Sequence, residues 1–283
     1  MILIKRIILE YPCIRKLIKN GYYLFTFNIF KKKRISLITE ADLNKLSLIR
    51  TCTLDNSLYG IDKIYQKAYD KEFFFEHGYY WGNVIPQGEK AKIIKTIFTI
   101  SKRRELFLKE NLNKNVKYID PYIVNANICK ITKNNILNLR LSANKPIRLF
   151  IPGHSEKKNS YCIVNPVPDV EFTTIVLLYY LDYDRVDKVD GNIYISCGQA
   201  YDPKFLERLK SLLIYSDYIE TNFLGTHIIY ANALGLDINF SGNINDSKFQ
   251  ILQIHESLYG FHNTEEKNNL IEDIESVSEK LAY

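Results

Sequence analysis

Cysteine is scarce and scattered in this chain of 283 residues. The five cysteines are Cys13, Cys52, Cys129, Cys162 and Cys197, and no two of them have CxxC spacing. An odd number of dispersed cysteines argues against a disulfide framework and against a zinc site built from paired cysteines. It is typical of proteins in a reducing compartment. We therefore expect a cytoplasmic protein.

Long hydrophobic runs are also missing. The longest candidate, residues 21–30, reaches about half of the roughly 20 residues that a membrane-spanning helix needs, and it contains polar side chains. No small-residue cleavage site follows an apolar stretch, so we expect no signal peptide. These absences argue against an integral membrane protein and against export.

The common cofactor and metal motifs are absent as well. No P-loop, GxGxxG, HExxH, GxSxG or EF-hand spacing occurs. Asp182-Tyr-Asp184 fits the letters of a DxD metal motif, but we interpret it as a solvated loop. We expect no bound metal and no cofactor.

The positive charge is confined to one end. The net charge is +6, and residues 1–34 contain nine Lys or Arg against the single acid Glu10, so the rest of the chain is slightly acidic. A local excess of this kind argues against a nucleic-acid binder. Residues 1–34 are amphipathic and suit an anionic membrane surface, which would make the protein peripheral on the inner face of the cell membrane. A solvated helix followed by a strand is the alternative, and both interpretations remain open.

Hydrophobic patterning predicts an α/β protein. Residues 72–76 and 93–100 have the pattern of buried strands, Ser101 stands as the N-cap of a helix over 102–112, and 116–119 is a further strand. Strand–helix–strand is the unit of a parallel sheet. We assign residues 1–122 to an N-terminal domain.

Residues 123–146 are rich in Asn and Lys and weakly patterned, which predicts a linker to a second domain over 147–283. The second domain is predicted to contain strands at 147–151, 175–181, 193–196, 218–221 and 236–240 and helices that begin at Asp202-Pro203 and at Thr226, with an acidic helix over 265–281. Gly235 is placed at the C′ position of the second of these helices. No helical pattern separates the strands at 147–151 and 175–181, where Pro166 and Pro168 lie.

The turn between the strand at 218–221 and the following helix is the most informative stretch. Asn222, Gly225, Thr226 and His227 bring an amide, a glycine, a hydroxyl and an imidazole to a helix N-terminus. Such a terminus has unpaired N–H groups and partial positive charge, which suit a phosphate. The alternative is that Thr226 only caps its helix and His227 packs on the surface.

Two more histidines follow predicted strands. Glu76-His77-Gly78 places a carboxylate beside an imidazole, a pairing suited to a general base. Pro152-Gly-His154-Ser155 follows the first strand of the second domain. Because ligands of open parallel sheets bind at the carboxyl ends of strands, the three loops together indicate a site.

These stretches resemble parts of GT-B glycosyltransferases of bacterial capsule and lipopolysaccharide biosynthesis. Thr99-Ile-Ser101 with its helix, and Val116–Asp120 with Pro121, are similar to the end of the N-terminal domain in that family. The Asn-x-x-Gly-Thr-His core over 222–227 resembles the donor-phosphate turn, and Glu76-His77-Gly78 is similar to the His-Gly loop of these enzymes and of teichoic-acid polymerases. Pro152-Gly-His154-Ser155 resembles the first loop of their nucleotide-binding domain. The chain is short for the family, and the Gly-x-Pro that usually follows the donor helix is Gly235-Leu236-Asp237 here.

The resemblance implies two Rossmann-like domains facing a cleft, the N-terminal one reduced, and metal-independent transfer of a sugar from a nucleotide-sugar donor to a surface-polysaccharide or lipid-linked acceptor. It implies that His77, supported by Glu76, deprotonates the acceptor. It also implies that His154, Ser155, Asn222, Gly225, Thr226 and His227 hold the nucleotide phosphates. A teichoic-acid-type glycerol- or sugar-phosphate transferase and a non-catalytic scaffold of a polysaccharide assembly complex are the alternatives.

Overall fold

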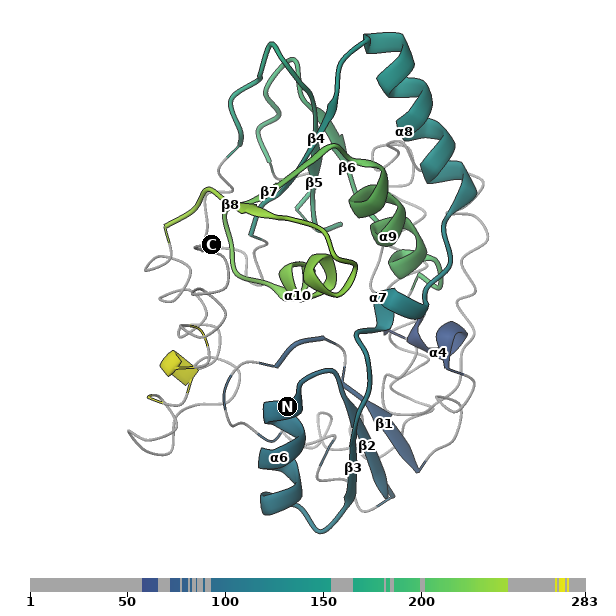
Figure 1. Ribbon diagram of the computed structural model, residues 1–283, viewed down its shortest axis with the longest axis vertical. Helices are drawn as coiled ribbons and strands as arrows, with labels where there is room; N and C mark the ends of the chain where they lie inside the picture. The colour runs from purple at the N-terminus through teal and green to yellow at the C-terminus, as the bar shows by residue number, and fades with distance from the viewer. Residues whose placement is uncertain are drawn as a thin grey trace, which may run out of the picture.

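The computed structural model of this chain is an α/β fold with two separate parallel sheets (Figure 1). It describes residues 58–65, 72–76, 78–80, 82, 85, 89, 93–153, 165–180, 182–183, 186–198, 202–243, 268, 270–272 and 274. One sheet has three strands and the other has five, and all neighbouring strands run parallel. The predicted α/β class with parallel sheets is therefore confirmed.

The three-stranded sheet has the order β1-β2-β3. Its strands are β1 (Phe73–Phe75), β2 (Thr96–Thr99) and β3 (Asn115–Tyr118). Helix α6 (Lys102–Asn111) joins β2 to β3, and the Ser101 hydroxyl accepts the Arg104 N–H at 3.3 Å as its N-cap. The predicted strand–helix–strand unit and its cap are confirmed. Before β1, a short 3₁₀ turn η2 (Leu58–Gly60) leads into α4 (Ile61–Ile64).

The connection between the sheets is helical. Residues 123–146, predicted to be a linker, contain most of α7 (Tyr122–Asn125) and all of α8 (Lys130–Ala143). The pattern did not indicate α8 because only Thr132 and Ile136 are buried on it, while another apolar side chain of the helix, Leu141, is exposed. The segment does run from one sheet to the other, and the boundaries of the domains stay a prediction.

The five-stranded sheet has the order β6-β5-β4-β7-β8, which is 3-2-1-4-5 in chain order. Its strands are β4 (Ile147–Ile151), β5 (Thr173–Leu177), β6 (Ile193–Ile195), β7 (Tyr218–Thr221) and β8 (Asn239–Phe240). This order is Rossmann-like, and the direction in which strands are added reverses between β4 and β7. All five predicted strands are present, β4 and β7 with the predicted bounds.

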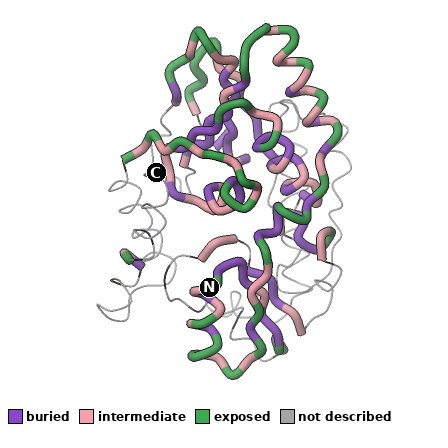
Figure 2. Tube along the Cα trace, viewed as in Figure 1, coloured by how far each residue is buried: buried purple, intermediate pink, exposed green. Residues whose placement is uncertain are grey.

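One face of this sheet carries the helices. Ile147 and Leu149 of β4 are fully buried in the core together with residues of α9 (Phe205–Tyr215) and α10 (Thr226–Ala233). Burying a large aliphatic side chain stabilises the fold by about 1.5–3 kcal/mol. The same core includes Phe75 of β1, so it joins the two sheets. Figure 2 shows the buried trace following the strands of both sheets, with exposed stretches along α8.

A second group of buried side chains lies on the opposite face of the sheet. Phe150, Val176 and Tyr194 pack there with Leu178 and Tyr183. Between β4 and β5, and between β5 and β6, the described residues form no helix.

The predicted start of α9 is wrong by a few residues. Asp202 was expected to be the N-cap, but the N-cap is Lys204, which makes no side-chain capping bond. The Asp202 carboxylate is buried, where it accepts the Lys204 N–H at 2.9 Å and pairs with Arg208. The ion pair holds this carboxylate in the turn before the helix.

Two predicted segments are described little or not at all. The basic residues 1–34 lie outside the described residues. Of the predicted helix over 265–281, the described residues are helical, and Leu270 and Ile274 are buried against Leu224 and Ile228 beside α10. Within the described chain, no helix is long and apolar enough to cross a membrane.

Candidate functional site

The carboxyl ends of β4 and β7 lie side by side where the strand order reverses. In open α/β sheets, ligands bind outside the carboxyl ends of the strands at this switch point. Gly153 follows β4 and Asn222 follows β7, and the Gly153 N–H donates to the Asn222 side-chain oxygen at 3.1 Å. The predicted turn over 222–227 therefore lies at the switch point, and its first residue is bonded to the loop in which His154 and Ser155 were predicted.

A hydrogen-bond network around Thr221 fixes the orientation of His227. The Thr221 hydroxyl lies 2.7 Å from the Ile151 carbonyl, 3.1 Å from the Phe223 carbonyl and 2.8 Å from His227 Nε2. Carbonyls only accept, so the single hydroxyl proton points to one of them and His227 Nε2 is the donor to Thr221. In the neutral ring this tautomer leaves Nδ1 without a proton.

Gly225 is needed because the His227 ring approaches the backbone closely. A Cβ at position 225 would lie 2.9 Å from both Nδ1 and Cε1 of that ring, closer than side-chain contacts allow. Gly225 is the N-cap of α10, and it has no side chain with which to cap the first turn. The N-terminus of α10 therefore presents backbone N–H groups beside the switch point.

The loop after β1 reaches the same helix terminus. The Tyr79 N–H donates to the Thr226 hydroxyl at 3.1 Å, and a Cβ at Gly78 would lie 2.8 Å from the same oxygen. Thr226 is the first residue of α10 and does not cap it, so its hydroxyl serves the contact between the loops. Two predicted loops from different sheets thus meet at one point. His77 itself lies outside the described residues, as do His154 and Ser155.

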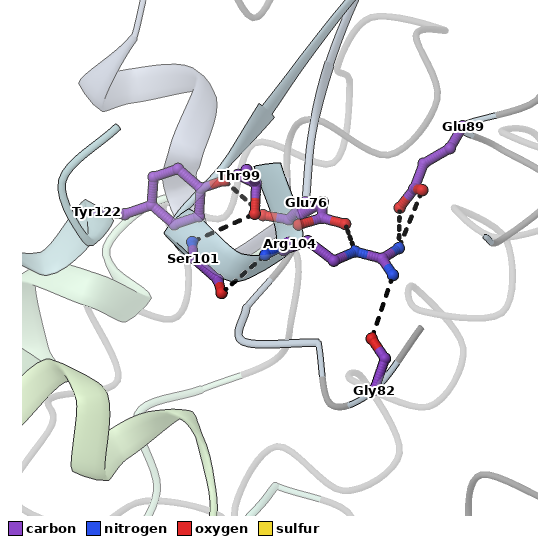
Figure 3. Close-up of polar contacts among 7 residues, drawn as sticks. All are labelled: Glu76, Gly82, Glu89, Thr99, Ser101, Arg104 and Tyr122. Atoms are coloured by element: carbon purple, nitrogen blue, oxygen red, sulfur yellow. Dashed lines mark hydrogen bonds and ion pairs between the residues drawn. The ribbon is translucent and has the colours of Figure 1, made fainter. Parts of the chain in front are cut away.

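Glu76, the predicted partner of His77, is fully buried and bound to Arg104 (Figure 3). Arg104 Nε donates to Glu76 Oε1 at 2.7 Å, and Arg104 Nη2 lies 3.1 and 3.0 Å from the two carboxylate oxygens of Glu89. The Tyr122 hydroxyl donates to the Glu76 carbonyl at 2.5 Å. Arg104 and Tyr122 therefore hold the residue that precedes His77 from both its side chain and its backbone.

Two carboxylates share one guanidinium in this cluster, which we call the Glu76–Arg104–Glu89 triad. Burial raises the pKa of Glu89 to about 9, Arg104 opposes this rise, and Glu76 adds to it. Burial disfavours the charge of Arg104, but the carboxylates of Glu76 and Glu89 outweigh burial and raise its pKa. One carboxyl group of the triad therefore keeps a proton at neutral pH, which reduces the repulsion between them.

Several residues that shape the site were not singled out in the sequence. Thr221, Tyr79, Arg104 and Glu89 act through contacts between segments far apart in the chain, which local patterns do not record. Of these four residues, only Thr221 could have been found from the sequence, because it is a hydroxyl residue at the last position of a predicted buried strand. Among the described residues, no three potential metal ligands lie together.

Comparisons with known proteins give no family for the chain. No protein-family model, curated protein or solved structure matches it. Any functional assignment therefore rests on the residues and contacts described above.

Proposed function

We propose that the protein is a glycosyltransferase that moves a sugar from a nucleotide-sugar donor to a surface-polysaccharide or lipid-linked acceptor. The observation that carries the proposal is the hydrogen bond from Tyr79 to Thr226. It joins the loop that resembles an acceptor-activating His-Gly loop to the turn that resembles a donor-phosphate turn. In the proposed enzyme the two sheets face a cleft, and the acceptor and donor meet at its floor.

The donor phosphates would lie on the N-terminus of α10. Its uncapped N–H groups and partial positive charge favour an anion and stabilise the charge that develops on the leaving group. Asn222 and Thr226 flank this terminus, and His154 and Ser155 are placed nearby by sequence alone. The hydrogen bond between Nε2 of His227 and Thr221 fixes the His227 ring beside this terminus, where the resemblance assigns it to the phosphate site.

His77 would act as the general base on the acceptor hydroxyl. The Glu76 carboxylate is engaged by Arg104, so in this proposal Glu76 anchors the chain next to His77. Proton transfer by a positioned group contributes about 10²- to 10⁴-fold to a rate. The proposal therefore requires His77→Ala to lose most of the activity without loss of stability.

Release of nucleotide from donors tests this function without a known acceptor. Purified protein is incubated with UDP-, GDP-, TDP- and CMP-sugars, and the freed nucleotide is measured by chromatography. We expect release from one donor class and a loss of about tenfold or more in Thr226→Ala, since the proposal has the Thr226 hydroxyl donate to a charged phosphate oxygen and the substitution removes that bond. Thr132→Ala is the matched control, because its buried hydroxyl on α8 has no hydrogen-bond partner among the residues that the structure describes. If folded wild type releases nucleotide from none of the donors, the scaffold alternative replaces this proposal.

A further inference from the structure

A pocket of about 430 Å³ lies on the sheet face that carries Phe150. The described residues that line it come from β4, β7 and nearby loops: Arg148, Phe150, residues 165–169, Glu220, Asn222 and Ser241. Its volume falls within the range of about 300–1,000 Å³ that is typical of small-molecule sites.

The charges in the pocket disfavour an anion. Arg148 Nε donates to Glu220 Oε2 at 2.8 Å, and Arg148 Nη2 lies 2.6 Å from the same oxygen. Asp169 Oδ2 lies 3.9 Å from Arg148 Nη1. Among the described residues that line the pocket, one guanidinium thus faces two carboxylates, which gives this set a formal charge of −1. A phosphate or carboxylate would be repelled here, unlike at the N-terminus of α10.

The groups left for a ligand are hydrogen-bond acceptors, a hydroxyl and apolar surface. Glu220 has a side chain only 8% exposed, and in the described part of the chain its Oε1 accepts no hydrogen bond. Ser241 adds a hydroxyl, and Phe150, Pro166 and Pro168 add apolar area. Acceptors beside apolar surface match a ring that carries hydroxyl groups on its edge and C–H groups on its faces.

We infer that this pocket binds a neutral sugar ring. The inference deepens the proposed function and rests on it for the origin of the sugar. Asn222 belongs both to the pocket and to the turn at the switch point, so a sugar here lies beside the proposed phosphate site. The ring belongs either to the donor or to the acceptor glycan, since the same chemistry recognises both.

Ligand-observed NMR with simple sugars tests the pocket directly. The probes are the methyl glycosides of glucose, galactose and N-acetylglucosamine, with glucose 1-phosphate and glucosamine as charged counterparts. We expect at least one neutral glycoside to bind wild type and glucose 1-phosphate to bind more weakly. Binding of glucosamine alone would contradict a site for neutral sugars, and so would the absence of binding by every neutral glycoside.

Variants distinguish the pocket from the phosphate site. Ser241 is exposed, so Ser241→Leu fills the pocket without disturbing the core, and we expect it to weaken the glycoside about tenfold or more. Glu220→Gln should weaken it similarly, since a hydrogen bond to a charged group is lost. Asp217→Asn is the control, because it weakens an Arg–Asp pair of Arg140 outside the pocket. Undiminished glycoside binding in Ser241→Leu overturns the inference.

Measuring nucleotide binding in the same experiment separates the pocket inference from the proposed function. If UDP, GDP, TDP or CMP binds and no glycoside does, only the pocket inference fails. If a glycoside binds in a Ser241-dependent manner and no nucleotide does, the pocket inference stands and the proposed function fails. Competition between the glycoside and a nucleotide-sugar, but not the free nucleotide, assigns the pocket to the donor sugar; simultaneous binding assigns it to the acceptor.

Discussion

The backbone N–H of Tyr79 donates a hydrogen bond to the hydroxyl of Thr226, 147 positions later in the chain. Tyr79 lies in the loop after β1 of the three-stranded sheet, and Thr226 begins the helix after β7 of the five-stranded sheet. Gly78 allows the approach, because any side chain there would press on the same hydroxyl. The contact fixes the loop after β1 against the switch point of the other sheet, where the proposed phosphate site lies.

The first prediction concerns this hydrogen bond. Thr226→Ala leaves the partly buried Tyr79 N–H without its acceptor, so we expect the free energy of unfolding to fall by about 1 kcal/mol. Thr226→Ser keeps the hydroxyl and should retain most of the stability. Urea denaturation of the three proteins measures both values. An equal loss in the serine and alanine variants would show that the methyl group, and not the hydroxyl, stabilises this contact.

Arg104 provides the second prediction. Arg104→Met removes the guanidinium from two buried carboxyl groups, and breaking a buried ion pair from one side costs about 3–5 kcal/mol. Lys109→Met removes an exposed pair with Glu105 and should change stability by less than about 1 kcal/mol. Adding Glu76→Gln and Glu89→Gln to Arg104→Met should recover much of the loss. Chemical denaturation compares these variants, and a small effect of Arg104→Met would contradict the buried triad.

The raised pKa of Glu89 predicts a specific pH dependence of stability. Its ordinary value is 4.5 and burial raises the folded-state pKa to about 9, so between these values the folded protein keeps a proton that the unfolded chain releases. The contribution of Glu89 is therefore fully present below about pH 4.5 and is lost as the pH rises towards 9, with a slope of at most about 1.4 kcal/mol per pH unit.

Glu89→Gln should remove this slope, because glutamine is neutral throughout. The free energy of unfolding is measured for both proteins across this pH range, and the variant should gain on wild type as the pH rises. Glu105→Gln is the control: the hydrogen bond from Lys109 lowers the pKa of Glu105, so its loss cannot produce the same trend. If the free energy of unfolding changes with pH in the same way for wild type and Glu89→Gln, the proton is not retained on Glu89.

Gly235 gives a fourth prediction, on the end of α10. Its φ is +70°, and a Cβ there would meet nothing within 4 Å, so substitution strains only the backbone. We expect Gly235→Ala to cost about 1–2 kcal/mol and Gly235→Asn to cost less, because Asn tolerates the left-handed conformation. Thermal unfolding compares the variants. Equal stability of wild type and Gly235→Ala would contradict this conformation at position 235.

Local patterns predicted the elements that their own residues determine. β7, α10 and Gly235 were placed correctly, because a buried strand, a helix beginning and a C′ glycine each leave a signal within a few positions. α8 was missed because only two of its side chains, Thr132 and Ile136, are buried, so its buried face left little periodic signal. The start of α9 was displaced because the buried pair of Asp202 with Arg208 is formed across a turn.

The site was predicted as three loops at strand ends, and the structure joins the described parts of all three. Gly153 bonds to Asn222, and Tyr79 bonds to Thr226. The sequence did not reveal that Arg104 forms an ion pair with the carboxylate of Glu76, because the fold brings together two residues that are 28 positions apart in the chain. Contacts of this kind depend on the tertiary fold, which a single sequence does not display.

Nucleotide binding at the junction of the two loops tests the central claim most directly. The melting temperature of wild type, Thr226→Ala and the control Thr132→Ala is measured with UDP, GDP, TDP and CMP. A ligand that binds only the folded protein must raise the melting temperature. We expect one nucleotide to raise the melting temperature of wild type and Thr132→Ala but to raise that of Thr226→Ala much less. No shift with any nucleotide, or an equal shift in all three proteins, would contradict a phosphate site where Tyr79 meets Thr226.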